Sequence, residues 1–157
     1  MNIVVLGSGG WGTALAMLLE QNRHTVTLWS HDPKKAEQLK LKRENPLLPG
    51  VQLPVKLQIT NDLNCLRNAE LVVFAPPSFA LHAVAKEAAP YLPDGVPLFL
   101  FVGRLMWYKG LHIILDALRA LREQGQAFRM VFIGAGGDEK EVRAEVETLR
   151  LSDRCFF

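Results

Sequence analysis

Cysteine is scarce in this sequence, which has two among its 157 residues, Cys65 and Cys155. They lie far apart and form no CxxC motif, so a disulfide scaffold is excluded and reduced thiols in a cytosolic setting are expected. No stretch approaches the ~20 consecutive apolar residues that span a membrane. The beginning, Met-Asn-Ile-Val-Val, has neither the charged region nor the cleavage site of a signal peptide. We therefore expect a cytoplasmic chain with no membrane partner.

An excess of charge of one sign is also lacking, because the formal net charge is only +2 at pH 7. This balance gives no reason to expect nucleic acid as a partner. With 49% hydrophobic and 22% charged residues, the chain is unlike disordered or collagen-like proteins. Its histidines, cysteines and acidic residues show no metal-ligand spacing, so no metal site is predicted.

Short apolar runs alternate with helical patterns along the chain. The runs predict buried strands, and apolar residues at helical spacing predict helices. Asp32 followed by Pro33 predicts a helix start, with an N-cap and a proline at the first position. The alternation predicts an α/β fold, a single three-layer αβα domain with a mostly parallel sheet and, through right-handed crossovers, helices on both faces. The expected strands are 3–6, 26–29, 56–60, 71–75, 98–102, 129–133 and 155–157, and the expected helices are 13–22, 33–42, 79–89, 111–124 and 138–151.

Composition changes near residue 98. The chain has nine prolines, the last of which is Pro97, and asparagine does not occur after Asn68. Lysine outnumbers arginine before this point and arginine outnumbers lysine after it. Helices and strands exclude proline, which explains its loss, but they do not explain the exchange of lysine for arginine. Chance and two different origins for the two parts both account for this composition.

The first strand is followed by a glycine-rich turn, Gly7-Ser8-Gly9-Gly10-Trp11-Gly12. It contains G-x-G-x-x-G between a strand and a helix, the placement typical of a dinucleotide-binding loop. Gly7 would make the tight turn, Gly9 would admit the pyrophosphate and Gly12 would allow close helix packing. The helix N-terminus would supply N–H donors to the phosphates. All six residues are candidate cofactor-binding residues, and an ordinary tight turn is the alternative.

At the end of the second strand, Ser30 takes the place of the acidic residue that usually binds the adenosine ribose. Ser30 and His31 are the candidate cofactor-binding residues here. Lys34 and Lys35 follow within reach of a 2′-phosphate, which favours NADP, but they equally suit a solvent-exposed helix face. The choice between NAD and NADP stays open.

Residues 1 to about 97 resemble the N-terminal domain of bacterial NAD(P)-dependent glycerol-3-phosphate dehydrogenases. The resemblance implies that the glycine loop and the residues after the second strand hold the cofactor, and that the stretch around Pro77 lies along the nicotinamide side. The family's Thr-Lys-Gly segment and its helical domain, with the catalytic lysine, have no counterpart, so no catalytic residue is predicted. The resemblance rests on 4–16, Val26-Thr27-Leu28-Trp29, Asn45, Leu48-Pro49-Gly50, Leu53-Pro54 and Ala75-Pro76-Pro77-Ser78.

Residues from about 99 onward resemble the start of the nucleotide-sugar domain of GT-B glycosyltransferases of the family 4 type. The resemblance implies that Arg104 and Lys109 bind the donor diphosphate, which suits two cations beside a strand end. Two surface cations on a loop are the alternative. The family's glutamate-bearing helix and acceptor domain have no counterpart. The resemblance rests on Phe101-Val102-Gly103-Arg104-Leu105, Lys109-Gly110-Leu111, Ala117-Leu118, 131–136 and 151–157.

The two resemblances together favour an engineered chimera of two Rossmann fragments (1–98 and 99–157). Their strands could join in one doubly wound, Rossmann-like sheet, in an order such as 3-2-1-4-5-6, as a single domain over residues 1–157. Such a chain would have no native catalytic function and would retain at most weak NAD(P) binding. We expect a monomer or a weak homodimer, with an exposed Met106-Trp107-Tyr108 patch that favours association. A fragment of an NAD(P)-dependent glycerol-3-phosphate dehydrogenase and a nucleotide-sugar-binding glycosyltransferase fragment are the alternatives.

Overall fold

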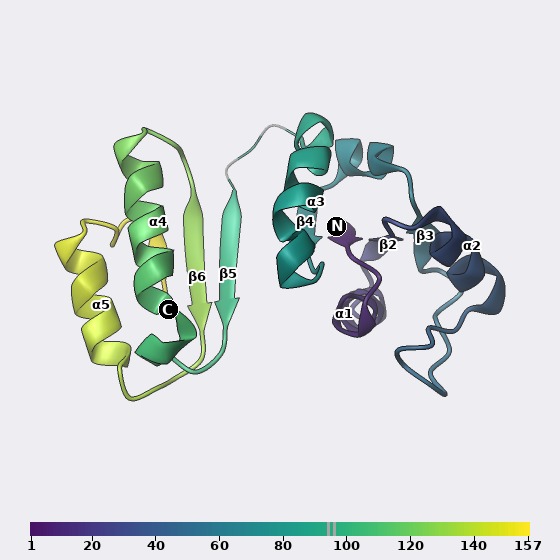
Figure 1. Ribbon diagram of the computed structural model, residues 1–157, viewed down its shortest axis with the longest axis horizontal. Coiled ribbons are helices and arrows are strands. Elements are labelled where there is room, and N and C mark those ends of the chain that lie inside the picture. The colour runs from purple at the N-terminus through teal and green to yellow at the C-terminus, as the bar shows by residue number, and fades with distance from the viewer. Residues whose placement is uncertain (94, 96) are drawn as a thin grey trace. The chain divides into compact units, whose positions relative to one another are not determined.

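The computed structural model describes residues 1–93, 95 and 97–157. Contacts divide the chain into two compact units, Met1–Pro93 and Asp94–Phe157, called the N-terminal unit and the C-terminal unit below. Figure 1 shows the helices and strands of both units. Each unit has a parallel sheet of its own and hydrophobic clusters of its own.

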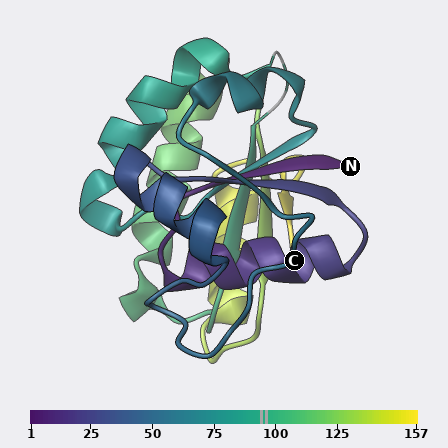
Figure 2. The same cartoon turned by 90° about the vertical axis from the view of Figure 1, so that its right-hand side faces the viewer.

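Four parallel strands form the sheet of the N-terminal unit: β1 (Asn2–Leu6), β2 (Thr25–Trp29), β3 (Gln58–Thr60) and β4 (Leu71–Phe74). Their order is β3-β2-β1-β4, and β1 and β2 run side by side in Figure 2. The chain therefore winds from β1 to β3 on one side and then adds β4 on the other side of β1. In such sheets a ligand crevice opens at the carboxyl ends of the strands where the winding reverses, here β1 and β4.

The helices of the N-terminal unit are α1 (Gly10–Gln21), α2 (Pro33–Lys42) and α3 (Leu81–Ala88). The predicted N-cap of α2 is confirmed, because the Asp32 carboxylate accepts a 2.8 Å hydrogen bond from the Lys34 N–H. The helix expected over 79–89 is interrupted at both ends by 3-10 turns, Ser78–Ala80 and Ala89–Tyr91. Pro90 has no N–H to continue the α-helical hydrogen bonds, so α3 ends before it. A further 3-10 helix, Leu63–Asn68, was not predicted.

Three parallel strands form the sheet of the C-terminal unit: β5 (Leu98–Val102), β6 (Arg129–Ile133) and β7 (Cys155–Phe156), in the order β5-β6-β7. The helix α4 (Leu111–Glu123) connects β5 to β6, and α5 (Glu139–Thr148) connects β6 to β7. A 3-10 turn, Trp107–Lys109, precedes α4. The bounds of β5 and β6 are those predicted from their apolar runs.

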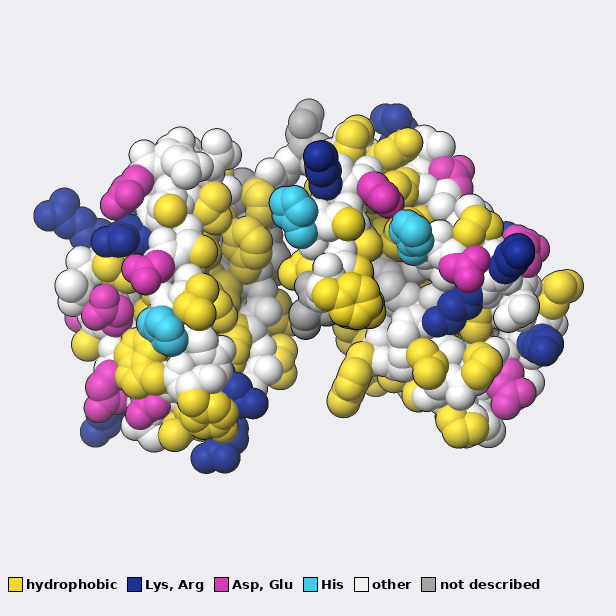
Figure 3. Space-filling view, viewed as in Figure 1, with side chains coloured by type: hydrophobic (Ala, Val, Ile, Leu, Met, Phe, Trp, Pro, Cys, Tyr) yellow, Lys and Arg dark blue, Asp and Glu magenta, His cyan; other side chains and the backbone are white. Residues whose placement is uncertain are grey.

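The surface of both units carries mixed charge. In Figure 3, lysine and arginine side chains are interspersed with aspartate and glutamate side chains over both units, in keeping with the small net charge of +2. Hydrophobic side chains lie between them on the same face. The helices of the described residues include none that is both long enough and apolar enough to span a membrane.

The sheet of the N-terminal unit is covered by apolar side chains on both faces. Alternation along β1 sends Ile3 and Val5 to one face, where they belong to a buried cluster with residues of α1 and α2. Val4 and Leu6 reach the other face and cluster with Val84 of α3. Helices on both faces give this unit the expected three layers.

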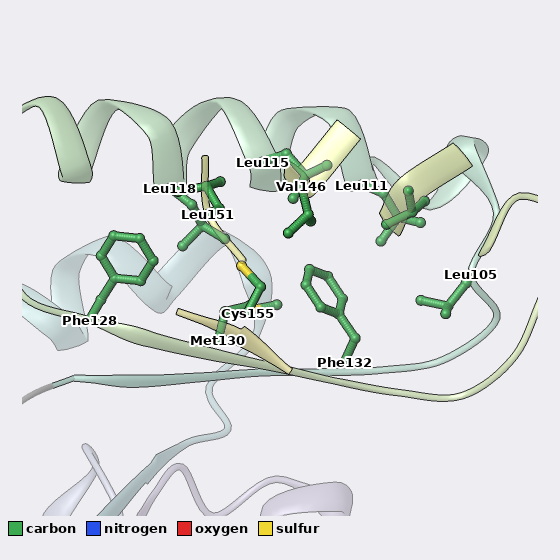
Figure 4. Close-up of a cluster of buried hydrophobic side chains, with 11 residues drawn as sticks. Leu105, Leu111, Leu115, Leu118, Phe128, Met130, Phe132, Val146, Leu151 and Cys155 are labelled. Carbon is green, nitrogen blue, oxygen red and sulfur yellow. The ribbon is translucent and has the colours of Figure 1, made fainter. Parts of the chain in front are cut away.

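Both helices of the C-terminal unit pack on the same face of its sheet. Figure 4 shows Leu111, Leu115 and Leu118 of α4 directed toward Met130 and Phe132 of β6, and α5 contributes two valines to the same buried cluster. The strands advance in one direction from β5 to β7, and right-handed crossovers then place both connecting helices on one side.

The predicted fold class is confirmed, because parallel strands alternate with helices and the winding of the N-terminal unit is Rossmann-like. The described strands pair in the order β3-β2-β1-β4 within the N-terminal unit and β5-β6-β7 within the C-terminal unit, and one continuous sheet in the order 3-2-1-4-5-6 stays a prediction. Alternation along a strand specifies which face is buried but not which neighbouring edge the strand pairs with. That residues 1–157 form a single domain stays a prediction.

Both thiols should react slowly at neutral pH. Burial, with a smaller contribution from a nearby aspartate, raises the pKa of Cys65 to about 11 and the pKa of Cys155 to about 11. The thiolate is the reactive form and an ordinary cysteine has a pKa of about 8.5, so alkylation by iodoacetamide at pH 8 should be about 100-fold slower than in urea. Mass spectrometry of timed samples measures both rates. Equal rates in the folded and unfolded chain would contradict the prediction.

Candidate functional site

The glycine loop connects β1 to α1 at the carboxyl end of the sheet. Gly7 has a φ of 122°, and its N–H donates to the Trp29 carbonyl at 3.0 Å. A Cβ on Gly7 would lie 2.6 Å from the Ala75 carbonyl oxygen, and a Cβ on Gly12 would lie 2.0 Å from the Gly7 carbonyl oxygen. Both positions therefore need glycine, the first for a tight turn and the second for close packing of α1 on β1.

Gly9 differs from Gly7 and Gly12 because the space beside its α-carbon is open. Its backbone is extended, with φ −68° and ψ 177°, and a Cβ there would meet no described atom within 4 Å. The helix α1 begins at the next residue, Gly10, and the first N–H groups of a helix have no partners inside it. Gly9 thus lies in an open cradle at a helix N-terminus, which is an arrangement that suits a phosphate.

Ser8, between the two glycines, is buried and held by three side chains. Its hydroxyl donates to the hydroxyl of Ser30 at 2.8 Å. Its carbonyl oxygen accepts from the Lys35 ammonium at 2.8 Å and from the Asn45 carboxamide at 3.2 Å. Ser8 therefore ties the glycine loop to the end of β2, to α2 and to the segment that follows α2.

Asn45 belongs to this site although no sequence pattern predicted a role for it there. It is fully buried at the start of the proline-rich segment 45–54. Its carboxamide nitrogen also donates to the Thr13 hydroxyl at 2.7 Å, and its carboxamide oxygen accepts from the Leu47 N–H at 3.1 Å. Periodicity does not mark a buried polar residue in a loop, so its presence in the resemblance to the dehydrogenases was the available signal.

Ser30 and His31 follow β2 beside the glycine loop. Ser30 is buried, and its N–H donates to the Thr60 carbonyl at 2.8 Å. The His31 Nε2 lies 3.8 Å from a carboxylate oxygen of Glu87 on α3. The two candidate ribose contacts therefore lie at the carboxyl end of β2, one buried and one at the surface.

The two lysines expected near a 2′-phosphate differ in their surroundings. Lys34 is exposed, and its N–H is used in the cap of α2 by Asp32. Lys35 is half-buried and its ammonium donates to the Ser8 carbonyl. The charge of Lys35 is thus directed toward the glycine loop.

The end of β4 lies against the glycine loop. The Ala75 N–H donates to the Leu6 carbonyl at 2.8 Å, and the exposed Pro77 follows two residues later. Two aromatic side chains near the carboxyl ends of β1 and β4, Trp11 and Phe79, are 90% and 91% exposed. The carboxyl ends of β1 and β4 therefore offer exposed aromatic surfaces on which a flat ring could stack.

Arg104 and Lys109 lie between β5 and α4 in the C-terminal unit. Both side chains are exposed, and the Lys109 ammonium lies 5.2 Å from the centre of the Tyr108 ring. Within the described part of the chain, neither is in an ion pair with a carboxylate. Two cations with no described carboxylate within ion-pair distance are suited to an anionic ligand.

The expectation of an exposed patch at Met106, Trp107 and Tyr108 is corrected for its first two members, which are half-buried. Trp107 packs against the buried cluster of the C-terminal unit, and its backbone N–H donates to the Asp138 carboxylate at 2.8 Å. The Met106 sulfur accepts from the Gly137 N–H at 3.2 Å. This segment is therefore tied to the loop after β6, which the sequence alone does not show.

A search for metal ligands covers the part of the chain that the structure describes. Among residues 1–93, 95 and 97–157, no group of three or more His, Cys, Asp or Glu side chains could hold a metal ion.

Two family models match this chain, one over most of its length and the other over its C-terminal part. A model described as NAD-dependent glycerol-3-phosphate dehydrogenase N-terminus matches residues 2–122. A model described as glycosyl transferases group 1 matches residues 96–157, so the two matches overlap over 96–122. A solved structure of glycerol-3-phosphate dehydrogenase from Coxiella burnetii aligns with 96% of this chain and 38% of its own chain, at 19% identity and a TM-score of 0.35.

Curated relatives align with the N-terminal part. A glycerol-3-phosphate dehydrogenase [NAD(P)+] of Fusobacterium nucleatum is 43% identical over 96 residues, which are 60% of this chain and 29% of the relative. The enzyme of the same name from Chlorobium luteolum is 46% identical over 88 residues, 55% of this chain and 26% of the relative. The chain thus spans less than a third of the length of these relatives. On the family match over residues 2–122, the chain belongs to the family of the NAD-dependent glycerol-3-phosphate dehydrogenase N-terminus.

Proposed function

We propose that the N-terminal unit binds NAD or NADP, with the pyrophosphate over Gly9. The observation that carries the proposal is the open cradle at Gly9, where a Cβ would meet no described atom within 4 Å, directly before the N-terminus of α1. Gly7 and Gly12 would shape the turn, and the N–H groups of Gly10 and Trp11 would face the phosphates. Ser8 would hold the loop in place through its hydrogen bonds to Ser30, Lys35 and Asn45.

The rest of the cofactor would lie along the carboxyl ends of β2 and β4. Ser30 and His31 would contact the adenosine ribose, and Pro77 would lie on the nicotinamide side. The relatives are named for activity with NAD(P)+, which supports the class of cofactor and leaves both members of it open. For this chain we propose binding of the cofactor, which is one part of the chemistry for which the longer relatives are named.

Calorimetric titration with NADH and NADPH tests this proposal. We expect saturable one-to-one binding of at least one of the two, because the loop needs no rearrangement to admit a pyrophosphate. Circular dichroism on the same sample verifies that the chain is folded. A well-folded chain that binds neither dinucleotide would contradict the proposal.

A second candidate function is binding of a nucleotide sugar by the C-terminal unit, with Arg104 and Lys109 on its diphosphate. Its support is the family match over residues 96–157 and the absence, among described residues, of an acidic partner for either cation. Titration with UDP-glucose should then show binding that is lost in Arg104→Ala and kept in Gly9→Val. Binding of equal strength in Arg104→Ala would contradict this assignment.

Joining of two fragments into one engineered chain is a hypothesis that the second family match supports. The curated relatives support a fragment of an NAD(P)-dependent glycerol-3-phosphate dehydrogenase better, because they carry the name of that enzyme. A genome in which one continuous reading frame encodes this sequence would exclude the engineered origin.

A further inference from the structure

The carbonyl oxygen of Ser8 accepts two side-chain donors from different parts of the chain. The Lys35 ammonium reaches it from α2 at 2.8 Å, and the Asn45 carboxamide nitrogen reaches it from the segment after α2 at 3.2 Å. Lys35 is half-buried and Asn45 is fully buried. Both donors therefore contact the loop backbone from the interior of the N-terminal unit.

The orientation of the Asn45 carboxamide follows from its partners. The Leu47 N–H can only donate, so the carboxamide oxygen faces Leu47 and the amino group faces Ser8 and Thr13. With both hydrogens of the amino group donated and the oxygen accepting, the buried carboxamide is held in one orientation.

Fixing the Ser8 carbonyl also fixes the N–H of Gly9. The two groups belong to one planar trans peptide, in which C=O and N–H point in opposite directions. With the carbonyl directed at Lys35 and Asn45, the Gly9 N–H points away from both. Among the hydrogen bonds of the described residues, the Gly9 N–H donates to no acceptor, so it is available to an anion.

We infer that Lys35 and Asn45 are positioning residues for dinucleotide binding, which hold the Ser8–Gly9 peptide so that the Gly9 N–H faces the pyrophosphate. This inference rests on the proposed cofactor binding. It assigns Lys35 a role that is the same for NAD and NADP, in contrast to a direct contact with a 2′-phosphate, which only NADP carries.

The test compares Lys35→Met with Lys34→Met. Both variants remove one positive charge from neighbouring positions, but only Lys35 donates to Ser8. We expect Lys35→Met to weaken NADH and NADPH binding by the same factor, about 5- to 10-fold, since a hydrogen bond from a charged donor is lost. Lys34→Met should change NADH binding less than about twofold, because its exposed charge is screened. Calorimetry measures the dissociation constants of NADH and NADPH for the wild type and both variants.

A second readout separates positioning from general stability. In the ligand-free protein, the amide resonance of Gly9 should shift in Lys35→Met and in Asn45→Asp, which removes the donor at nearly unchanged size, and should stay in place in Lys34→Met. Thermal melts identify any variant that does not fold. If Asn45→Asp is unfolded, Lys35→Met alone decides.

Two results would overturn the inference while leaving the proposed function intact. One is a loss in Lys35→Met that is confined to NADPH, which would indicate direct contact with the 2′-phosphate. The other is unchanged binding of both dinucleotides in Lys35→Met. A folded wild-type chain that binds neither dinucleotide would instead overturn the proposed function and this inference together.

Discussion

Replacing Gly9 with valine should abolish dinucleotide binding while the fold survives. The extended backbone of Gly9, with φ −68° and ψ 177°, is accessible to valine, and a Cβ there would meet no described atom within 4 Å. The added methyl groups would instead occupy the space proposed for the pyrophosphate. We expect binding of NADH to weaken by about 100-fold or more, about 2.8 kcal/mol, measured by calorimetry.

Gly10→Ala is the matched control for this variant. A Cβ on Gly10 would face the neighbouring segment, 3.6 Å from the Leu47 carbonyl oxygen, which is an ordinary contact. Its dinucleotide affinity should stay within about threefold of wild type, roughly 0.7 kcal/mol. The Gly9→Val substitution places valine at the N-cap of α1 and should also lower the free energy of unfolding by about 1 kcal/mol. Full binding by Gly9→Val would show that the pyrophosphate does not lie over Gly9.

Replacing Gly12 with alanine should destabilise the N-terminal unit by about 3 kcal/mol or more. The new Cβ would lie 2.0 Å from the Gly7 carbonyl oxygen and 3.3 Å from the Ala75 Cβ. A backbone oxygen at the end of a buried strand cannot move aside as a flexible side chain could, so α1 must separate from β1. Urea unfolding followed by circular dichroism measures the loss, which is a large part of the ~5–15 kcal/mol stability of an ordinary domain.

The same chemical change two residues earlier provides the comparison. Gly10→Ala adds a Cβ in ordinary contact and replaces a poor helix former at the start of α1, so the free energy of unfolding should rise by up to about 1 kcal/mol. Gly136→Ala in the C-terminal unit should behave like Gly12→Ala, because its Cβ would lie 2.0 Å from the Leu105 carbonyl oxygen. Equal stability of Gly12→Ala and Gly10→Ala would refute the close helix packing.

Much of the fold could be predicted because its signals are local. The apolar runs at β1, β5 and β6 and the cap at Asp32 depend on a few neighbouring residues. The glycine motif is equally local, and the contacts of Gly7 and Gly12 account for the roles expected of them. The ends of α3 were less predictable, because Pro90 divides one helical pattern into an α-helix and a 3-10 turn.

The residues that hold the loop in place lay beyond such local reasoning. Lys35 matched a solvent-exposed helix face and a phosphate contact equally well, but in the structure its ammonium meets a backbone carbonyl 27 positions away. Asn45 lies in a loop without hydrophobic periodicity. It is nevertheless fully buried, and its carboxamide donates to the same carbonyl. Such hydrogen bonds join segments that are far apart in the sequence. They form only when the chain has folded, and no repeating pattern of residues predicts them.

The sequence by itself determined the kinds of element, their order and the position of the glycine motif, because hydrophobic period, turn chemistry and capping act over a few residues. The tertiary structure alone decided the order of the strands within each unit, β3-β2-β1-β4 and β5-β6-β7. It also decided that the Ser8 carbonyl is held by Lys35 and Asn45. Strand pairing and long-range hydrogen bonds depend on which surfaces meet when the chain packs. The residue pattern of one strand or helix does not specify which other element it will contact.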